Sequence, residues 1–304
     1  MSVLAYVFPG QGSQYVGMGK DLAAQNDAAR AMFERADAII GAQLSRICFE
    51  GPDDELKQTK NTQPAIFLHS TVLTTLIAPE TVAMTAGHSL GEYSALVFAG
   101  ALSFEHGLRI VRLRGELMQQ AGEENPGTMA AVVGLEGPAL EAVCAEASAA
   151  GIVQCANFNS PGQIVISGSV TGVQKAMELA KAAGAKLVKQ LPVSGAFHSP
   201  LMNSARQSLH DALKNVEIRD ARIPVYTNVT AKPVQHAAEI RRMLEEQVTN
   251  AVRWDDSVRN MAADGATSFV EIGPGKVLQG LVKRISPAAG VRGIDTYADL
   301  QKSA

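Results

Sequence analysis

The sequence predicts an α/β protein in which a small subdomain is inserted into a larger domain built around a parallel sheet. Apolar segments rich in β-branched residues alternate with helical patterns along most of the chain, which favours the α/β class. Residues 127–192 instead show the element order βαββαβ, which is typical of a ferredoxin-like unit. We therefore expect a large domain from residues 1–126 and 193–304 and a small subdomain from residues 127–192.

The elements of the large domain follow from hydrophobic runs that end at glycine, proline or polar loops. Two helices are expected, one at residues 90–98 and one at residues 103–120, where apolar side chains recur with the helical period. The expected strands are Leu4–Phe8, Thr81–Ala86, Arg222–Asn228 and Thr267–Ile272.

The elements of the insert are bounded by clear stop signals. Its two helical segments end at Gly151 and Gly184, and the turn at residues 159–162 separates its two middle strands. The expected strands are Met129–Leu135, Ile152–Asn157, Gln163–Ser167 and Lys186–Leu191, and the expected helices are Pro138–Ala150 and Val170–Ala183.

Composition and charge exclude several classes of function. The formal net charge of −3 does not indicate nucleic-acid binding or a polybasic membrane surface. The first residues do not match a secretory signal, and no apolar run approaches the roughly 20 residues of a membrane span. The three cysteines show neither a disulfide framework nor a zinc spacing. We therefore expect a cytoplasmic protein without a metal and without nucleic-acid or membrane partners.

The segment AGHSLGEYSAL, residues 86–96, contains the G-x-S-x-G pattern of a nucleophile elbow. Ser89 follows an expected strand and precedes an expected helix, which is the context that this pattern requires. The alternative is a serine that only caps the following helix. We predict that Ser89 is a nucleophile, and a serine nucleophile needs a base.

His198 is the candidate base. It lies in a loop before a helix, where Ser199 and Pro200 fit the N-cap and first helical positions. The positive end of a helix favours the neutral imidazole that a base requires. The alternative is an exposed loop histidine. The remaining histidines adjoin the serine, lie in an apolar segment or lie in polar surroundings: His88, His69, His106, His210 and His236.

The acid that usually orients such a base is missing. No carboxylate between residues 89 and 198 stands at the end of an expected core strand, so a backbone carbonyl can orient the imidazole instead. Donors to an oxyanion are easier to find. The backbone N–H of Leu90 is one, and the glycine-rich turn FPGQGSQ at residues 8–14 can supply another. That turn does not fit the phosphate-binding glycine motifs.

Arg114 lies on the apolar face of the helix expected at residues 103–120, close to Val111 and Met118. An unpaired buried charge is strongly destabilising, so this arginine needs an anion. An internal carboxylate is the more common partner. A ligand carboxylate held by two parallel hydrogen bonds is the other. Together with a serine nucleophile, the second option indicates an acyl donor that carries a free carboxylate.

Seven ordered motifs resemble those of the malonyl-CoA:acyl carrier protein transacylases, the acyltransferases of bacterial type II fatty acid synthesis. The resemblance spans nearly the whole chain, and only residues 228–230 and the tail after Arg284 match loosely. The motifs are FPGQGSQ at 8–14, NTQPA at 61–65, GHSLGEYSAL at 87–96, RLRGELM at 112–118, NFNSPGQIVISG at 157–168, GAFHS at 195–199 and EIGPGKVL at 271–278.

The resemblance implies a hydrolase-like large domain and a role for each residue at a matching position. Ser89 would be the nucleophile, and His198 would be the acid and base, oriented by a backbone carbonyl; the matching glutamine is Gln247. Backbone N–H groups of Gln11 and Leu90 would form the oxyanion hole. The matching substrate-binding positions are Arg114, which would hold the malonyl carboxylate, Met118, Gln63, Asn159, and Phe197, which would crowd the acyl α-carbon.

The resemblance also implies malonyl-CoA, coenzyme A and acyl carrier protein as partners, with no cofactor. Three other functions remain open: a malonyl acyltransferase acting in trans for a polyketide synthase, a serine thioesterase or hydrolase, and an acyl-CoA-binding protein without catalysis. Acyl carrier proteins are typically acidic, so basic residues are candidates for docking one, although each is also compatible with an ordinary solvated surface. The candidates are Lys186, Lys189, Lys276, Lys283 and Arg284.

Overall fold

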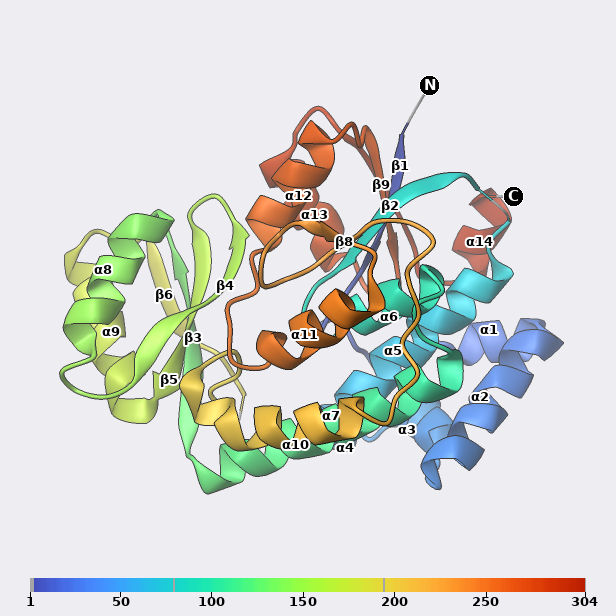
Figure 1. Ribbon diagram of the computed structural model, residues 1–304, viewed down its shortest axis with the longest axis horizontal. Coiled ribbons are helices and arrows are strands. Elements are labelled where there is room, and N and C mark those ends of the chain that lie inside the picture. Colours follow the sequence, from blue (N-terminus) through green and yellow to red (C-terminus); the bar gives the residue numbers. More distant parts are fainter. Residues whose placement is uncertain (1–2, 79, 194, 304) are drawn as a thin grey trace.

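A six-stranded sheet forms the centre of the larger part of the molecule (Figure 1). The computed structural model describes residues 3–78, 80–193 and 195–303. The strand order is β10-β9-β1-β2-β7-β8, and every neighbouring pair is parallel except β7 and β8. The predicted α/β class is thus confirmed. The strands are β1 (Leu4–Phe8), β2 (Val82–Gly87), β7 (Val225–Tyr226), β8 (Pro233–Val234), β9 (Ser268–Ile272) and β10 (Gly290–Ile294).

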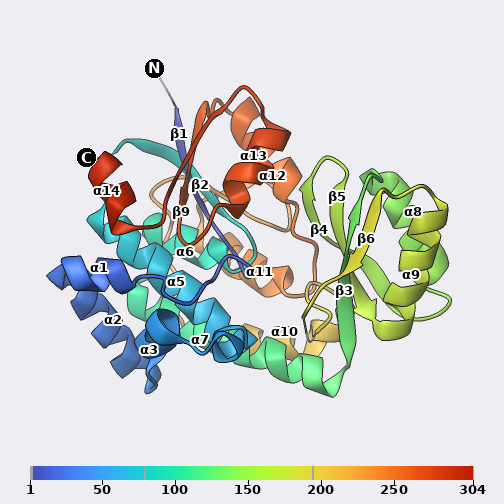
Figure 2. The same ribbon diagram turned by 180° about the vertical axis from the view of Figure 1, so that it is seen from behind.

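Helices cover both faces of this sheet because alternate side chains of its central strand point to opposite sides. Tyr6 and Phe8 belong to a core that includes residues of α5, α6 and α7. Ala5 and Val7 belong to a second core formed with α12 and α13, on the other side of the strands (Figures 1 and 2). The helices are α1 (Lys20–Gln25), α2 (Asp27–Ile40), α3 (Leu44–Glu50), α4 (Asp53–Leu56), α5 (Thr59–Leu76), α6 (Gly91–Phe98), α7 (Phe104–Glu124), α10 (Asn203–Leu213), α11 (Ala237–Gln247), α12 (Trp254–Ala263), α13 (Val277–Ile285) and α14 (Tyr297–Ser303).

A second sheet of four antiparallel strands lies beside the first, at the left of Figure 1. Its strand order β4-β5-β3-β6, with α8 and α9 packed on one face, is that of the predicted βαββαβ unit. We propose the division into residues 127–192 and the remainder as two domains, because one unbroken segment supplies this whole sheet. Its elements are β3 (Gly127–Val133), α8 (Gly137–Ala147), β4 (Val153–Ser160), β5 (Gln163–Ser169), α9 (Val170–Ala182) and β6 (Leu187–Gln190).

The structure differs from the sequence prediction at a few strands. β7 keeps only Val225 and Tyr226 of the strand predicted at 222–228, because the side chain of Asn228 turns toward the backbone of the β2–α6 turn. β8 and β10 were not predicted, since β8 spans two residues and Gly290 and Gly293 interrupt the apolar pattern of β10. β4 extends to Ser160, which shortens the predicted turn.

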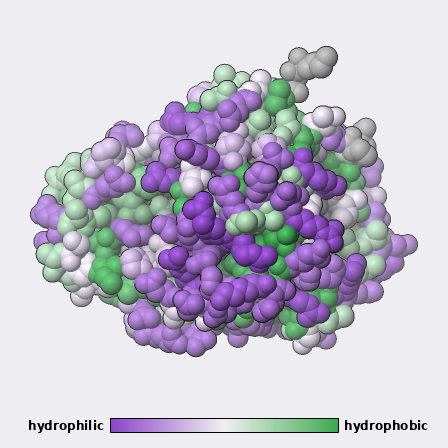
Figure 3. All heavy atoms as spheres, in the orientation of Figure 1, coloured by the Kyte–Doolittle hydropathy of each residue, from purple (hydrophilic) through white to green (hydrophobic). Residues whose placement is uncertain are grey.

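The surface is a mosaic in which hydrophilic residues predominate on the face shown in Figure 3. In the part of the chain that the structure describes, no helix is both long and apolar enough to cross a membrane. The large hydrophobic side chains that the structure finds exposed are Tyr15, Val16, Ile152, Val170, Leu187 and Val277.

Candidate active site

The tight turn between β2 and α6 holds Ser89 in a strained backbone conformation. Its φ is 50°, a region that residues with side chains rarely adopt. A Cβ at Gly87 would lie 1.9 Å from the backbone carbon of Gly91, and a Cβ at Gly91 would lie 2.1 Å from the carbonyl oxygen of Phe8. Both positions therefore require glycine. The glycines of the G-x-S-x-G pattern allow the start of α6 to pack closely against β2 and against the end of β1.

The imidazole of His198 lies in hydrogen-bond contact with the serine. Its Nε2 is 2.8 Å from Ser89 Oγ, and its Nδ1 is 2.8 Å from the carbonyl oxygen of Gln247. A carbonyl oxygen only accepts, so Nδ1 carries the proton and Nε2 accepts from the serine hydroxyl. The imidazole thus has the tautomer of a general base, with a backbone carbonyl behind it in place of a carboxylate.

The neutral state of this imidazole has a different origin from the one that the sequence indicated. The helix after His198 begins as a short 3₁₀ turn at Pro200–Met202, which Ser199 caps by accepting from the N–H of Leu201. Burial, followed by the positive charge of Arg114, lowers the pKa of His198 to about 3. The sequence correctly indicated a neutral imidazole, but the main cause of the lowered pKa is desolvation and not the helix dipole.

We expect His198 to remain neutral in the folded protein at pH 5. Nitrogen NMR of the imidazole should show the Nδ1–H tautomer unchanged between pH 8 and pH 5, whereas histidines in the urea-unfolded chain should titrate at about 6.5. The unfolded chain then binds a proton that the folded protein excludes, so this group lowers the free energy of unfolding as the pH falls from 6.5 toward 3. A protonated His198 at pH 5 would contradict the expectation.

Arg114 extends from α7 into the same site and is almost fully buried, with 1% of its surface exposed. Its Nη1 donates to Gln63 Oε1 at 2.6 Å. Its Nη2 donates to Gln247 Oε1 at 2.9 Å and to Ser89 Oγ at 3.1 Å. The guanidinium lies over the ring of Tyr93, whose hydroxyl is near but not in hydrogen-bond geometry. Among the described residues, the Nε–H of Arg114 has no acceptor, so the cation retains an unused donor.

Two further buried residues, Glu92 and Asn228, complete the polar network and were not predicted from the sequence. The side chain of Asn228 accepts from the N–H of Ser89 at 2.6 Å and donates to the carbonyl of Gly87 at 2.7 Å, which fixes both ends of the turn. Glu92 Oε2 accepts from the N–H of Asn228 and from Gln247 Nε2, each at 2.9 Å. An acidic residue in the first turn of a helix is ordinary, so the sequence carried no signal that Glu92 is buried.

A cavity of about 230 Å³ opens onto Ser89 between the two sheets. Gln247 stands behind its wall and bonds both Arg114 and the carbonyl of Ser89. Among the described residues, the backbone N–H groups of Gln11 and Leu90 have no hydrogen-bond acceptor, which leaves both available to a ligand. All the other predicted site residues line this cavity: Gln11, Gln63, Ser89, Leu90, Arg114, Met118, Asn159, Phe197 and His198.

The predicted substrate-binding residues differ in what they contact. Gln63 Nε2 donates to the sulfur of Met118 at 3.4 Å, so these two side chains fix each other beside the guanidinium. Asn159 Oδ1 lies 2.9 Å from Nε2 of His88, the histidine that adjoins the serine. The imidazole of His88 therefore bonds Asn159, whereas the imidazole that bonds Ser89 is that of His198. Phe197 is buried with its ring in the cavity wall.

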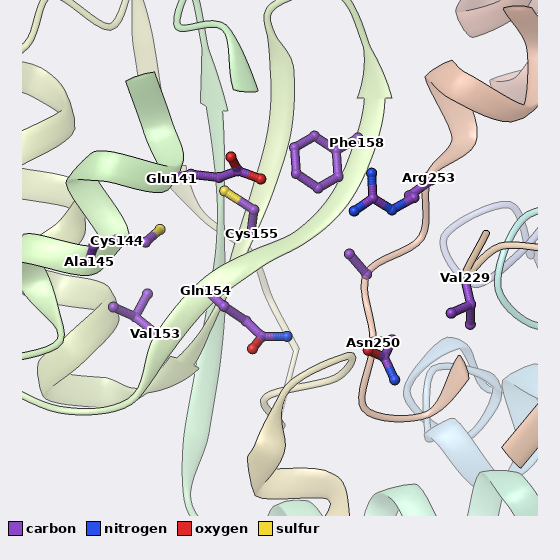
Figure 4. A pocket seen from close by; sticks show the side chains of 11 residues that line it. Glu141, Cys144, Ala145, Val153, Gln154, Cys155, Phe158, Val229, Asn250 and Arg253 are labelled. Atoms are coloured by element: carbon purple, nitrogen blue, oxygen red, sulfur yellow. The ribbon is translucent and has the colours of Figure 1, made fainter. Parts of the chain in front are cut away.

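A second cavity, of about 360 Å³, lies between β4 and the loop after α11 (Figure 4). Gln154 and Asn250 line it from opposite sides. The Nε2 of Gln154 donates to the carbonyl of His198 at 2.8 Å and to the carbonyl of Thr249 at 3.3 Å. Gln154 therefore ties the small sheet to the two segments that hold the imidazole, a connection that the sequence did not predict.

The basic docking candidates are all exposed. Two of them adjoin the cavity that contains Ser89: Lys276 precedes Val277, which lines it, and Arg284 donates to Oε1 of the lining residue Gln163 at 2.6 Å. Within the residues that the structure describes, no group of three or more histidine, cysteine, aspartate or glutamate side chains is placed to hold a metal ion.

Comparison with known proteins agrees with this geometry. The acyl transferase domain family model matches residues 5–295. The malonyl CoA-acyl carrier protein transacylase of Bacillus subtilis is 47% identical over 289 residues, covering 94% of this chain and 91% of that protein.

Solved structures show the same fold over essentially the whole length. An acyl carrier protein S-malonyltransferase from Vibrio cholerae superimposes with a TM-score of 0.96 at 41% identity, covering all of both chains. A malonyl-transacylase solved in complex with a type II polyketide synthase acyl-carrier protein gives a TM-score of 0.96 at 40% identity, covering 99% of both chains. The chain therefore belongs to the acyl transferase domain family.

Proposed function

We propose that this protein transfers the malonyl group of malonyl-CoA to the phosphopantetheine thiol of acyl carrier protein, through a malonyl ester of Ser89. One observation carries the proposal. Ser89 Oγ lies between His198 Nε2, at 2.8 Å, and a buried guanidinium, Arg114 Nη2, at 3.1 Å. A nucleophile, its base and a cation that no carboxylate of the described residues contacts directly thus meet in one cavity, and relatives at 39–47% identity are malonyl CoA-acyl carrier protein transacylases.

In the first half-reaction, the neutral imidazole takes the proton of the serine hydroxyl as Oγ attacks the thioester carbonyl. The backbone N–H groups of Gln11 and Leu90 stabilise the oxyanion of the tetrahedral intermediate. The carbon–sulfur bond then breaks, and the imidazolium of His198 returns its proton to the departing sulfur, so coenzyme A leaves as a thiol. The carbonyl of Gln247 keeps the imidazole in the same orientation for both proton transfers.

In the second half-reaction, the thiol of the carrier protein replaces coenzyme A and the steps run in reverse. His198 accepts the thiol proton, the sulfur attacks the ester, and the proton returns to Ser89 Oγ. No net oxidation or hydrolysis occurs. We propose that the carrier protein approaches the rim of the cavity near Lys276 and Arg284, where its acidic surface meets exposed basic side chains.

Arg114 explains a preference for a donor that ends in a carboxylate. Its pKa is lowered mainly by burial, so the site gains from an anion that restores the lost solvation. The unused Nε–H is a donor for that anion. A neutral acyl group such as acetyl provides no anion for Arg114. Phe197 lies in the cavity wall, where it would disfavour a branch at the acyl α-carbon.

A polyketide carrier protein is the second candidate acceptor. The observation in its favour is the 40% identical malonyl-transacylase solved in complex with a type II polyketide synthase acyl-carrier protein. The chemistry at Ser89 is the same for both acceptors. We place the reaction in the cytoplasm, where thiols such as the free cysteines of this chain, Cys48, Cys144 and Cys155, stay reduced.

The test is incubation with malonyl-CoA followed by holo-acyl carrier protein, with intact mass spectrometry of both proteins. We expect one malonyl adduct on the enzyme and its transfer to the carrier protein faster than its loss to water. Carrier proteins from fatty acid and polyketide synthesis, compared by kcat/KM, identify the acceptor. Release of free malonate without labelling of any carrier protein would overturn the proposal in favour of a serine hydrolase.

A further inference from the structure

The buried carboxylate of Glu92 has no part in the proton transfers described above. It lies in the first turn of α6 with 1% of the residue exposed. Both hydrogen bonds that the structure places on it meet one oxygen, Oε2, which accepts from Gln247 Nε2 and from the N–H of Asn228. A carboxylate in this position needs a compensating charge, because burial disfavours its ionised form.

The compensating charge is Arg114, and the amide of Gln247 lies between the two. Gln247 Oε1 accepts from Arg114 Nη2, while Gln247 Nε2 donates to Glu92 Oε2. The amide dipole is therefore aligned with its oxygen toward the cation and its nitrogen toward the anion. Among the described residues, no carboxylate comes within salt-bridge distance of Arg114, so Glu92 balances its charge through the amide.

The remaining ionisable groups around Glu92 are neutral. Tyr93, the next residue on α6, has a pKa raised to about 12, chiefly by burial. His198, on the loop that faces Arg114, and His88, before the elbow, both have lowered pKa values because they are buried. Above pH 7 the free enzyme thus holds one positive and one negative charge in the site, on Arg114 and Glu92. A malonyl group would add a second negative charge beside these buried side chains.

We propose that Glu92 neutralises Arg114 in the free enzyme and takes up one proton when a dicarboxylic acyl group is bound. This rests on the proposed function, because it assigns the arriving carboxylate to Arg114. Glu92 is a positioning residue here, since it acts through Gln247 and Asn228 and touches no reacting atom. The protonated acid still accepts from both donors at Oε2, so the elbow and the imidazole keep their positions in both charge states.

The direction of the pH dependence follows from the environment of Glu92. Burial is the largest effect and raises the pKa of this carboxyl group. The hydrogen bonds from Asn228 and Gln247 and the attraction of Arg114 lower the pKa, and the net value is about 7. A second carboxylate at Arg114 raises the pKa of Glu92 further. Above pH 7, malonyl loading therefore requires a proton from solution, and its equilibrium constant is expected to fall by about tenfold per pH unit.

The experiment measures protons and adducts together. Formation of malonyl-Ser89 and coenzyme A thiol from malonyl-CoA and the serine hydroxyl is itself proton-neutral. Stoichiometric loading in weakly buffered solution at pH 7.5, with a pH indicator, is expected to consume between about half and about three quarters of a proton per adduct counted by intact mass, since a carboxyl group with a pKa of about 7 is about three quarters ionised at this pH. Loading with acetyl-CoA, which brings no carboxylate, is expected to consume none.

Glu92→Gln is the matched variant, because an amide oxygen in the place of Oε2 keeps both hydrogen bonds while the charge is removed. This variant is expected to load malonyl with no proton uptake and with an equilibrium constant nearly independent of pH between 7 and 8, where the released thiol stays mostly protonated. Equal proton counts for malonyl and acetyl loading of the wild-type protein would overturn the proposal, whether or not the variant folds. Failure to form any malonyl adduct would instead overturn the proposed function.

Discussion

Replacement of Ser89 by alanine is expected to abolish the malonyl adduct and to lower the rate of malonyl transfer by about 10⁴–10⁶-fold. The hydroxyl bonds both His198 and Arg114, so its loss removes the nucleophile and leaves only binding and oxyanion stabilisation. The measurement is the intact mass after incubation with malonyl-CoA, together with the rate at which holo-acyl carrier protein is labelled.

Ser94→Ala is the matched control. Ser94 lies on α6, five positions after Ser89, and is fully buried. Its hydroxyl has no hydrogen-bond partner among the described residues, so its removal leaves no polar group unpaired. This variant is expected to retain the adduct and nearly full activity. A malonyl adduct that persisted in Ser89→Ala would show that another residue carries the acyl group.

Replacement of Arg114 by methionine is expected to remove the preference for malonyl-CoA over acetyl-CoA. Loss of a buried charge partner costs about 3–5 kcal/mol, which corresponds to a decrease of about 150-fold to about 5,000-fold in kcat/KM for malonyl-CoA. Acetyl-CoA makes no ion pair, so its kcat/KM is expected to change far less. Methionine is preferred to alanine because it fills most of the volume that the arginine vacates.

Arg112→Met provides the comparison on the same helix. The side chain of Arg112 is 23% exposed, and its Nε bonds Glu116 at 2.6 Å on the outer face of α7. Its loss is expected to leave the ratio of kcat/KM for the two donors unchanged. If Arg114→Met also kept that ratio, the guanidinium would not be the group that recognises the malonyl carboxylate.

The elements that the sequence predicted well are those whose pattern is local. Leu4–Phe8 is a run of apolar and aromatic residues in a central strand whose last four residues are buried, and the structure gives it the same limits. The βαββαβ order of the small sheet likewise depends on short runs and glycine stops. β10 escaped prediction because it is an edge strand whose residues, apart from Ile294, are not buried, so it lacks the apolar run of a central strand.

The parts of the site that escaped prediction depend on contacts between distant segments. Glu92 becomes a buried anion only because Asn228 and Gln247, 136 and 155 residues further along the chain, donate to it. Gln154 reaches the carbonyl of His198 across 44 residues, from a strand of the other sheet. Neither contact leaves a period or a spacing in the sequence. The residues that could be predicted, such as Ser89, stand in motifs whose local shape already demands particular side chains.

The backbone conformations of Ser89 and His198 carry a consequence for how this family changes over time. Three described residues other than glycine have positive φ, and two of them are Ser89, at 50°, and His198, at 57°. Each such residue costs about 1–3 kcal/mol, a substantial fraction of the roughly 5–15 kcal/mol that keeps a protein folded. Selection for stability alone would favour glycine at both positions. A lineage that keeps serine and histidine at these positions is therefore still selected for reactivity. A lineage that retains only the fold would be free to replace them.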